Sequence, residues 1–203
     1  MSELAVNHHA DHPGFSGLPG SLFALVFLLT GRASARLAAD LTGVAAGDHV
    51  VDVGCGPGTA ARMAAGNGAR VTGVDPSASM LRIARAVTRR NAAISWAEGS
   101  AESLPVADGC ATVVWALATV HHWQDVDAGI TEAQRVLGPG GRLLAVERQS
   151  PPGATGIASH GWTRDQAESF AALCRSKGML DVEVEDRHAG RKAVWAVSAT
   201  LRS

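Results

Sequence analysis

A short segment near residue 50 combines an acidic side chain with closely spaced glycines. Residues 50–59 read VVDVGCGPGT, in which an apolar run leads into Gly54, Gly56 and Gly58. Glycines tolerate positive φ and let the backbone approach a ligand, and a helix that follows directs its free N–H groups toward that ligand. Asp52 is awkward beside a pyrophosphate but suits a cationic amino-acid group. The GxGxG spacing also departs from the GxGxxG of dinucleotide-binding loops.

A second acid closes the next apolar run. Asp75 follows RVTGV at residues 70–74, so it is expected at the carboxyl end of a second strand. Ligands of open parallel sheets bind outside these strand ends, where a carboxylate can accept both hydroxyls of a ribose. The side chain could instead cap the helix that Pro76 and Ser77 start, and the two roles can coexist.

Histidines gather at two places in the chain. His121 and His122 follow an expected strand at 111–116, and an imidazole there could take a proton from an attacking oxygen or nitrogen. Alternatively, one of the pair packs structurally while the other only shapes a pocket wall. The second group is His8, His9 and His12 beside Asp11; contiguous residues rarely all face one ion, so no metal site is expected.

A framework of alternating strands and helices is expected to position these residues. The hydrophobic pattern predicts an α/β fold with strands at 49–53, 70–74, 94–96, 111–116 and 142–147, and helices at about 59–66, 77–90 and 125–137. A helix at 163–177 and two β-like runs, 182–187 and 193–200, follow. The expected architecture is a doubly wound, mostly parallel, seven-stranded sheet that ends in a C-terminal antiparallel hairpin.

The 203 residues suffice for one domain. Within a single domain at 1–203, we expect an N-terminal arm and helical lid at 1–45, a ligand-binding core at 46–148, and a C-terminal helix and hairpin at 149–203.

Four segments in register carry a resemblance to a known family. They are VVDVGCGPGT at 50–59, VTGVDPSASML at 71–81, EGSAESLPVADGCATVVWALATVHHW at 98–123 and RVLGPGGRLLAVE at 135–147. Together they resemble the class I S-adenosylmethionine-dependent methyltransferases, most closely the small-molecule branch, over about half of the chain. The resemblance implies a Rossmann-like methyltransferase fold, S-adenosylmethionine as cofactor and S-adenosylhomocysteine as product.

The resemblance also implies roles for individual residues. Asp52 and the glycine loop, with Cys55 inside it, would hold the methionine part, and Asp75 the ribose. Leu117 would meet the amino-acid end of the cofactor, and Gly138–Gly141 would form a turn before the fifth strand. The residues expected around the ribose and adenine are Pro76, Met80, Ser100, Ala101 and Glu102.

One position departs from the pattern of this branch. The branch usually reads Gly-Asp-Ala before a Leu-Pro pair, whereas this chain reads Gly99-Ser100-Ala101. A serine hydroxyl can accept a hydrogen bond from the adenine amino group but carries no charge, which would weaken binding by about 1 kcal/mol.

The acceptor pocket is expected to draw on segments outside the core. N-terminal segments often cover the substrate in this fold, so His12, Phe15 and a helix at Leu22–Leu29 are candidates for a lid. His160 and Trp162, after the fifth strand, are candidates for another wall.

Composition limits the partners. A net charge of −1 gives no basic surplus for nucleic acid. The apolar run at 22–29 is too short to span a bilayer, which takes about 20 residues. Three scattered cysteines fit a reducing, cytoplasmic compartment. The expected activity is in-line methyl transfer to a small, fairly apolar acceptor, with the oligomeric state left open.

Two other classes remain open from the sequence alone. One is a nicotinamide-dependent oxidoreductase, against which the loop spacing, Asp52 and the closing hairpin count. The other is a non-catalytic partner subunit with the methyltransferase fold, against which the intact glycine loop and Asp75 count.

Overall fold

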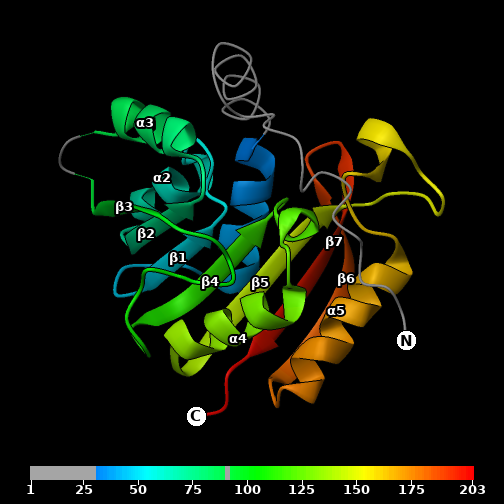
Figure 1. The fold of residues 1–203 in the computed structure, drawn as a ribbon. Coiled ribbons are helices and arrows are strands. Elements are labelled where there is room, and N and C mark those ends of the chain that lie inside the picture. The colour runs from blue at the N-terminus through cyan, green and yellow to red at the C-terminus, as the bar shows by residue number, and fades with distance from the viewer. Residues whose placement is uncertain (1–30, 90–91) are drawn as a thin grey trace.

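One mixed sheet organises the chain (Figure 1). In the computed structural model, which describes residues 31–89 and 92–203, seven strands lie in the order β3-β2-β1-β4-β5-β7-β6. β1 through β5 pair in parallel, and β7 runs antiparallel to both β5 and β6. The predicted fold class is therefore confirmed. The strand bounds are β1 His49–Val53, β2 Arg70–Asp75, β3 Ile94–Glu98, β4 Ala111–Leu117, β5 Leu137–Arg148, β6 Leu180–Ala189 and β7 Lys192–Thr200.

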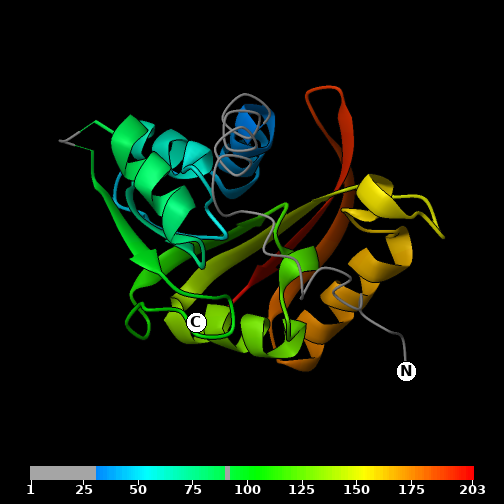
Figure 2. The same cartoon turned by 45° about the horizontal axis from the view of Figure 1, so that its top comes forward.

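Helices cover both faces of the sheet (Figure 2). A helix over 31–42, α2 (Thr59–Gly66) and α3 (Ala78–Val87) lie on one face, and α4 (Val126–Val136) and α5 (Arg164–Ser176) on the other. The chain therefore forms three layers, as expected when parallel strands alternate with crossover helices.

Helix starts follow the side chains that the sequence offers. Ser77 caps α3 by accepting a hydrogen bond from the Met80 backbone N–H at 3.4 Å. Thr163 and Gln166 form a reciprocal capping box at the start of α5. In contrast, the N-cap of α2 is Gly58, which offers no side-chain cap, so the glycine loop leads directly into this helix end.

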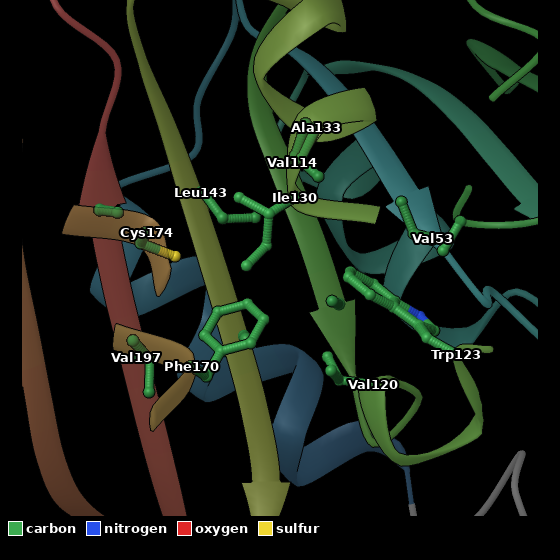
Figure 3. Close-up of a cluster of buried hydrophobic side chains, with 14 of the residues drawn as sticks. Val53, Val114, Val120, Trp123, Ile130, Ala133, Leu143, Phe170, Cys174 and Val197 are labelled. Atoms are coloured by element: carbon green, nitrogen blue, oxygen red, sulfur yellow. The ribbon is translucent and has the colours of Figure 1, made fainter. Parts of the chain in front are cut away.

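The core on the α4–α5 side fixes the carboxyl ends of the central strands (Figure 3). Ile130 of α4 and Phe170 of α5 are fully buried against the sheet, where Leu143 of β5 meets them. Trp123, just after β4, is 7% exposed and also packs against Phe170, with ring centroids 6.5 Å apart. This packing anchors the segment between β4 and α4, which contains both predicted histidines.

The expected turn at Gly138–Gly141 is wrong in detail. These residues lie inside β5, which begins at Leu137 opposite Ala111 and shifts register before Val113. The C-terminal segment explains the difference: Gly140 donates to the Leu201 carbonyl at 3.1 Å, and Leu201 donates back to Gly141 at 2.8 Å. Pairing with a chain segment distant in sequence thus draws these residues into β5, with Gly140 at a φ of +71°.

No helix within residues 31–89 and 92–203 is long and apolar enough to cross a membrane. The run at Leu22–Leu29 lies outside the described residues.

Candidate active site

The glycine loop is tied to the end of β2 by its backbone. Gly54 and Cys55 both donate to the Val74 carbonyl, at 2.8 and 3.0 Å. The Gly56 N–H donates to Oδ2 of Asp75 at 2.7 Å. The loop therefore meets the two strand ends that the sequence analysis selected, beside the point where β1 lies between β2 and β4. Open α/β sheets bind ligands at such a switch point.

Neighbouring side chains explain two of the glycines. A Cβ on Gly54, whose φ is +68°, would lie 2.0 Å from Oγ1 of Thr119. A Cβ on Gly58, whose φ is +76°, would lie 2.2 Å from the Trp96 ring. At Gly56, φ is +52° but nothing stands within 4 Å of the Cβ position. At Gly56 the positive φ alone favours glycine, and the space beside it is open.

This difference predicts separable effects of two substitutions. We expect Gly54→Ala to lower the free energy of unfolding by about 2–5 kcal/mol, because a left-handed alanine and an overpacked Thr119 both cost energy. We expect Gly56→Ala to cost only about 1–2 kcal/mol of stability but to weaken cofactor binding at least tenfold, because its methyl group would occupy the binding space. Urea unfolding and calorimetry measure the two quantities.

Gly43→Ala is the matched control. Gly43 has a φ of +60°, has nothing within 4 Å of its Cβ position, and does not line the pocket. It therefore reports the conformational cost alone. Cofactor affinity in Gly56→Ala equal to that in Gly43→Ala would contradict the assignment of this space to the cofactor.

A cavity of about 230 Å³ opens beside the loop, at the carboxyl ends of β1 and β4. Its walls combine the loop, the start of α2, the residues after β4, the helix over 31–42 and the start of β7. The lining residues are Gly31, Ser34, Asp52, Gly54, Gly56, Pro57, Thr59, Ala60, Met80, Leu117, Ala118, Thr119, His122 and Lys192.

Asp52 is the notable polar group in this cavity wall. Its side chain is buried, and within the described part of the chain its Oδ2 has no hydrogen-bond partner. Burial raises the pKa of Asp52 to about 7; a backbone hydrogen bond from Ala61 opposes this shift, and the nearby Asp75 adds to it. An unsatisfied buried carboxylate oxygen is costly, so a cationic ligand group fits this position.

Asp75 already has two partners. Oδ2 accepts from Gly56 and Oδ1 accepts from the Ser77 backbone N–H at 2.8 Å. Burial raises the pKa of Asp75, and these two hydrogen bonds oppose the shift. A carboxylate has about four acceptor sites, so capping the start of α3 leaves capacity for ribose hydroxyls.

The residues expected around the ribose and the adenine lie in different surroundings. Met80 lies in the cavity wall, Pro76 is exposed, and Ala101 is buried in the core. Glu102 accepts hydrogen bonds from the backbones of Gln124 and Asp125 at 2.7 and 3.2 Å.

Burial acts to raise the pKa of Glu102, but hydrogen bonds from its own backbone, from Ser100 and from residues 124–125 outweigh it and lower the pKa. Glu102 thus holds the segment after the histidines, with Ser100 as its neighbour.

Cys55 is not among the residues that line the cavity. It is 8% exposed and lies near Gly73. Burial raises the pKa of its thiol. Because the thiolate is the reactive form, this cysteine is expected to pack in the core rather than to react.

The two predicted catalytic histidines have different surroundings. His122 is exposed and lines the cavity. The Nδ1 atom of His121 lies 2.9 Å from Oε2 of Glu147, whose side chain is fully buried at the end of β5. Sequence reasoning missed Glu147. Its signal was an acid closing the expected strand 142–147, adjacent to the strand that precedes the histidines.

Lys192 and Ser34 are further cavity residues that the sequence analysis did not select. Lys192 stands at the start of β7, beside a hairpin whose Gly190 approaches Ala33. The hairpin tip and the helix over 31–42 thus form one wall together. Only their tertiary contact could reveal it, because the two segments are distant in sequence.

The expected pocket walls are only partly as predicted. His160 lies beside His121, with ring centroids 5.5 Å apart. Trp162 does not line the cavity described above: it is 2% exposed and packs on Phe170, and its backbone bonds to Arg148 and Ser150 tie it to the end of β5. His12, Phe15, the Leu22–Leu29 helix and the N-terminal histidine cluster lie outside the described residues.

Comparisons with known proteins agree with this geometry. The methyltransferase domain family matches residues 51–145. The chain is 40% identical over 106 residues to a ubiquinone/menaquinone biosynthesis C-methyltransferase of Rubrivivax gelatinosus, covering 52% of this chain and 41% of that protein. It is 39% identical over 134 residues to the 27-O-demethylrifamycin SV methyltransferase of Amycolatopsis mediterranei, covering 63% of this chain and 48% of that protein. The chain thus spans about half the length or less of these curated relatives.

A solved structure extends the likeness to the whole fold. A putative S-adenosylmethionine-dependent methyltransferase of Methanococcus maripaludis superposes with a TM-score of 0.74 at 18% identity, covering 100% of this chain and 98% of that one. Neither the oxidoreductase nor the partner-subunit alternative is favoured by these matches. Over residues 51–145 the chain is similar in sequence to the methyltransferase domain family, and it shares the fold of S-adenosylmethionine-dependent methyltransferases.

Proposed function

We propose that this protein binds S-adenosylmethionine and transfers its methyl group to a small acceptor. The observation that carries the proposal is Asp52: a buried carboxylate with an unsatisfied oxygen, in a cavity bounded by the glycine loop. The cofactor supplies a methyl group on a positively charged sulfur, open to in-line displacement with S-adenosylhomocysteine as product.

The residues of the loop and the strand ends hold the cofactor. Asp52 binds its ammonium group, which supplies the partner that Oδ2 lacks. Asp75 accepts from the ribose hydroxyls while keeping the loop on the end of β2 through Gly56. The N-terminus of α2 has no side-chain cap, so its positive dipole end is directed toward the cofactor.

The adenine side draws on Met80 and Ser100. Met80 supplies an apolar surface within the cavity wall. The Ser100 hydroxyl is the proposed acceptor for the adenine amino group, on a segment that Glu102 anchors. Ala101 supports this segment from the core.

The acceptor occupies the far end of the same cavity. Leu117, Ala118 and Thr119 follow β4 there, and Lys192 faces them from the hairpin. Several residues of this wall, among them Leu117 and Ala118, are apolar, which favours a small, largely apolar acceptor over nucleic acid. Orientation of the acceptor behind the methyl group is the main contribution of these walls. Without a bound ion, the imidazoles of His121 and His122, with His160 beside them, are the groups proposed to take a proton from the acceptor's oxygen or nitrogen.

The proposed compartment is the cytoplasm. Cys55, Cys110 and Cys174 are all free thiols, and two of them are buried. This fits a reducing environment.

Calorimetry on the full chain tests the cofactor assignment. We expect micromolar binding of S-adenosylmethionine and S-adenosylhomocysteine and no binding of NADH. A panel of small phenols, quinols and amines with radiolabelled cofactor then tests transfer. Tight NADH binding without binding of either sulfur compound would refute the proposal.

A further inference from the structure

Three imidazoles meet beside the cavity. His121 and His122 belong to the short 3-10 helix Val120–His122, and His160 follows another one at Gly156–Ser159. The ring centroids of His121 and His122 lie 4.0 Å apart, and that of His160 lies 5.5 and 5.9 Å from them. One nitrogen from each ring lies within 4.8 Å of the other two. Two separate segments thus converge on one point.

A buried carboxylate fixes one of these rings. Glu147 accepts from Nδ1 of His121 at 2.9 Å, and its other oxygen accepts from the His121 backbone N–H at 3.4 Å. An ionised carboxylate only accepts, so this pairing places a proton on Nδ1, and in the neutral ring Nε2 is then the nitrogen with the lone pair. Histidines that bind metals characteristically donate their second nitrogen to a carboxylate in this way.

Three histidines beside a cavity suit a metal site that keeps one coordination position open, rather than a fully coordinated structural site. Three neutral imidazoles are preferred ligands of zinc and related divalent ions, and a three-ligand site keeps a position open. His122 also lines the cavity that contains Asp52 and Leu117. The open position would therefore be next to the acceptor.

From these observations, we propose that His121, His122 and His160 bind a divalent transition-metal ion, with Zn²⁺ as the probe, and that Glu147 is the positioning residue for His121. Zn–N bonds of about 2.0–2.1 Å place tetrahedral ligand nitrogens roughly 3.4 Å apart, so binding needs small rotations of the rings. The ion would coordinate an oxygen of the acceptor. That role rests on the proposed function, whereas metal binding itself does not.

The test measures Zn²⁺ binding to the full chain without S-adenosylmethionine. Because His8, His9 and His12 also carry imidazoles, all three are replaced by alanine in the background protein. We expect one equivalent of Zn²⁺ to bind by calorimetry, and Co²⁺ to give the visible absorption of a tetrahedral site. His160→Ala and His122→Ala should each weaken binding at least 100-fold, and Glu147→Gln about 10- to 100-fold.

His188→Ala is the matched control, because His188 is an exposed histidine of β6 outside this cluster. It should bind Zn²⁺ like the background protein. Folding of each variant is checked by circular dichroism. If His160→Ala does not fold, His122→Ala alone tests whether the cluster binds Zn²⁺. No Zn²⁺ binding, or binding unchanged in the folded variants, would overturn the proposal. Either result leaves the calorimetry of S-adenosylmethionine intact, so the two proposals fail separately.

Discussion

Replacement of Asp75 by alanine is expected to weaken S-adenosylmethionine binding at least 100-fold. The carboxylate is proposed to accept from two ribose hydroxyls, and hydrogen bonds to charged groups contribute about 1.5–3 kcal/mol each. Together they exceed about 2.8 kcal/mol, which corresponds to a factor of 100. The variant also loses the bond from Gly56, which is 2.7 Å in length and holds the loop on the end of β2. Calorimetry with S-adenosylmethionine measures the change.

Ser77→Ala separates binding from local stability. Asp75 also accepts from the Ser77 backbone, so its loss disturbs the start of α3. Ser77→Ala removes the cap that the Ser77 hydroxyl gives to Met80 and costs about 1 kcal/mol, while it leaves the Asp75 carboxylate in place. We expect S-adenosylmethionine affinity to change less than threefold in this control. Equal losses of affinity in both variants would show that Asp75 acts only through the helix start.

The second large effect concerns the pH dependence of cofactor binding. Since burial raises the pKa of Asp52 to about 7, half of the protein without cofactor carries a protonated Asp52 at that pH. If only the carboxylate binds the ammonium group, affinity should rise about tenfold from pH 6 to pH 8. Asp52→Asn should bind more weakly at pH 8, and its affinity should be nearly constant over this range. A wild-type affinity that does not change with pH would contradict the assignment.

The raised pKa of Asp52 also predicts that the stability of the protein without cofactor falls as the pH rises, whereas cofactor affinity increases. The folded state holds the Asp52 proton more tightly than the unfolded chain, in which an aspartate has a pKa of about 3.9. Stability from this group is therefore fully present below about pH 4, falls as the pH rises, and levels off above about pH 7.

Between pH 5 and pH 8, the protein without cofactor should lose about 2–3 kcal/mol more stability than Asp52→Asn does. Urea unfolding at both pH values measures this difference. Equal losses in the two proteins would indicate that Asp52 has an ordinary pKa in the folded chain.

The sequence by itself determined the framework, and it supplied the residues proposed to hold the cofactor. Hydrophobic runs of period two and helical spacing, separated by glycine and capping residues, placed all seven strands and the order of α and β elements. Local chemistry sufficed because Asp52, the three loop glycines and Asp75 lie at the ends of adjacent strands, and a parallel sheet brings such ends together. The resemblance then named the ligand that this arrangement fits.

The tertiary structure alone decided which side chains lie together at the end of the cavity proposed for the acceptor. Glu147 reaches His121 because β5 pairs beside β4, and Lys192 enters the cavity wall because the β6–β7 hairpin folds back toward Ala33. Trp162 looked like a pocket wall, but burial of its large apolar ring against Phe170 outweighs exposure. Such choices depend on contacts between segments far apart in sequence, which no local pattern encodes.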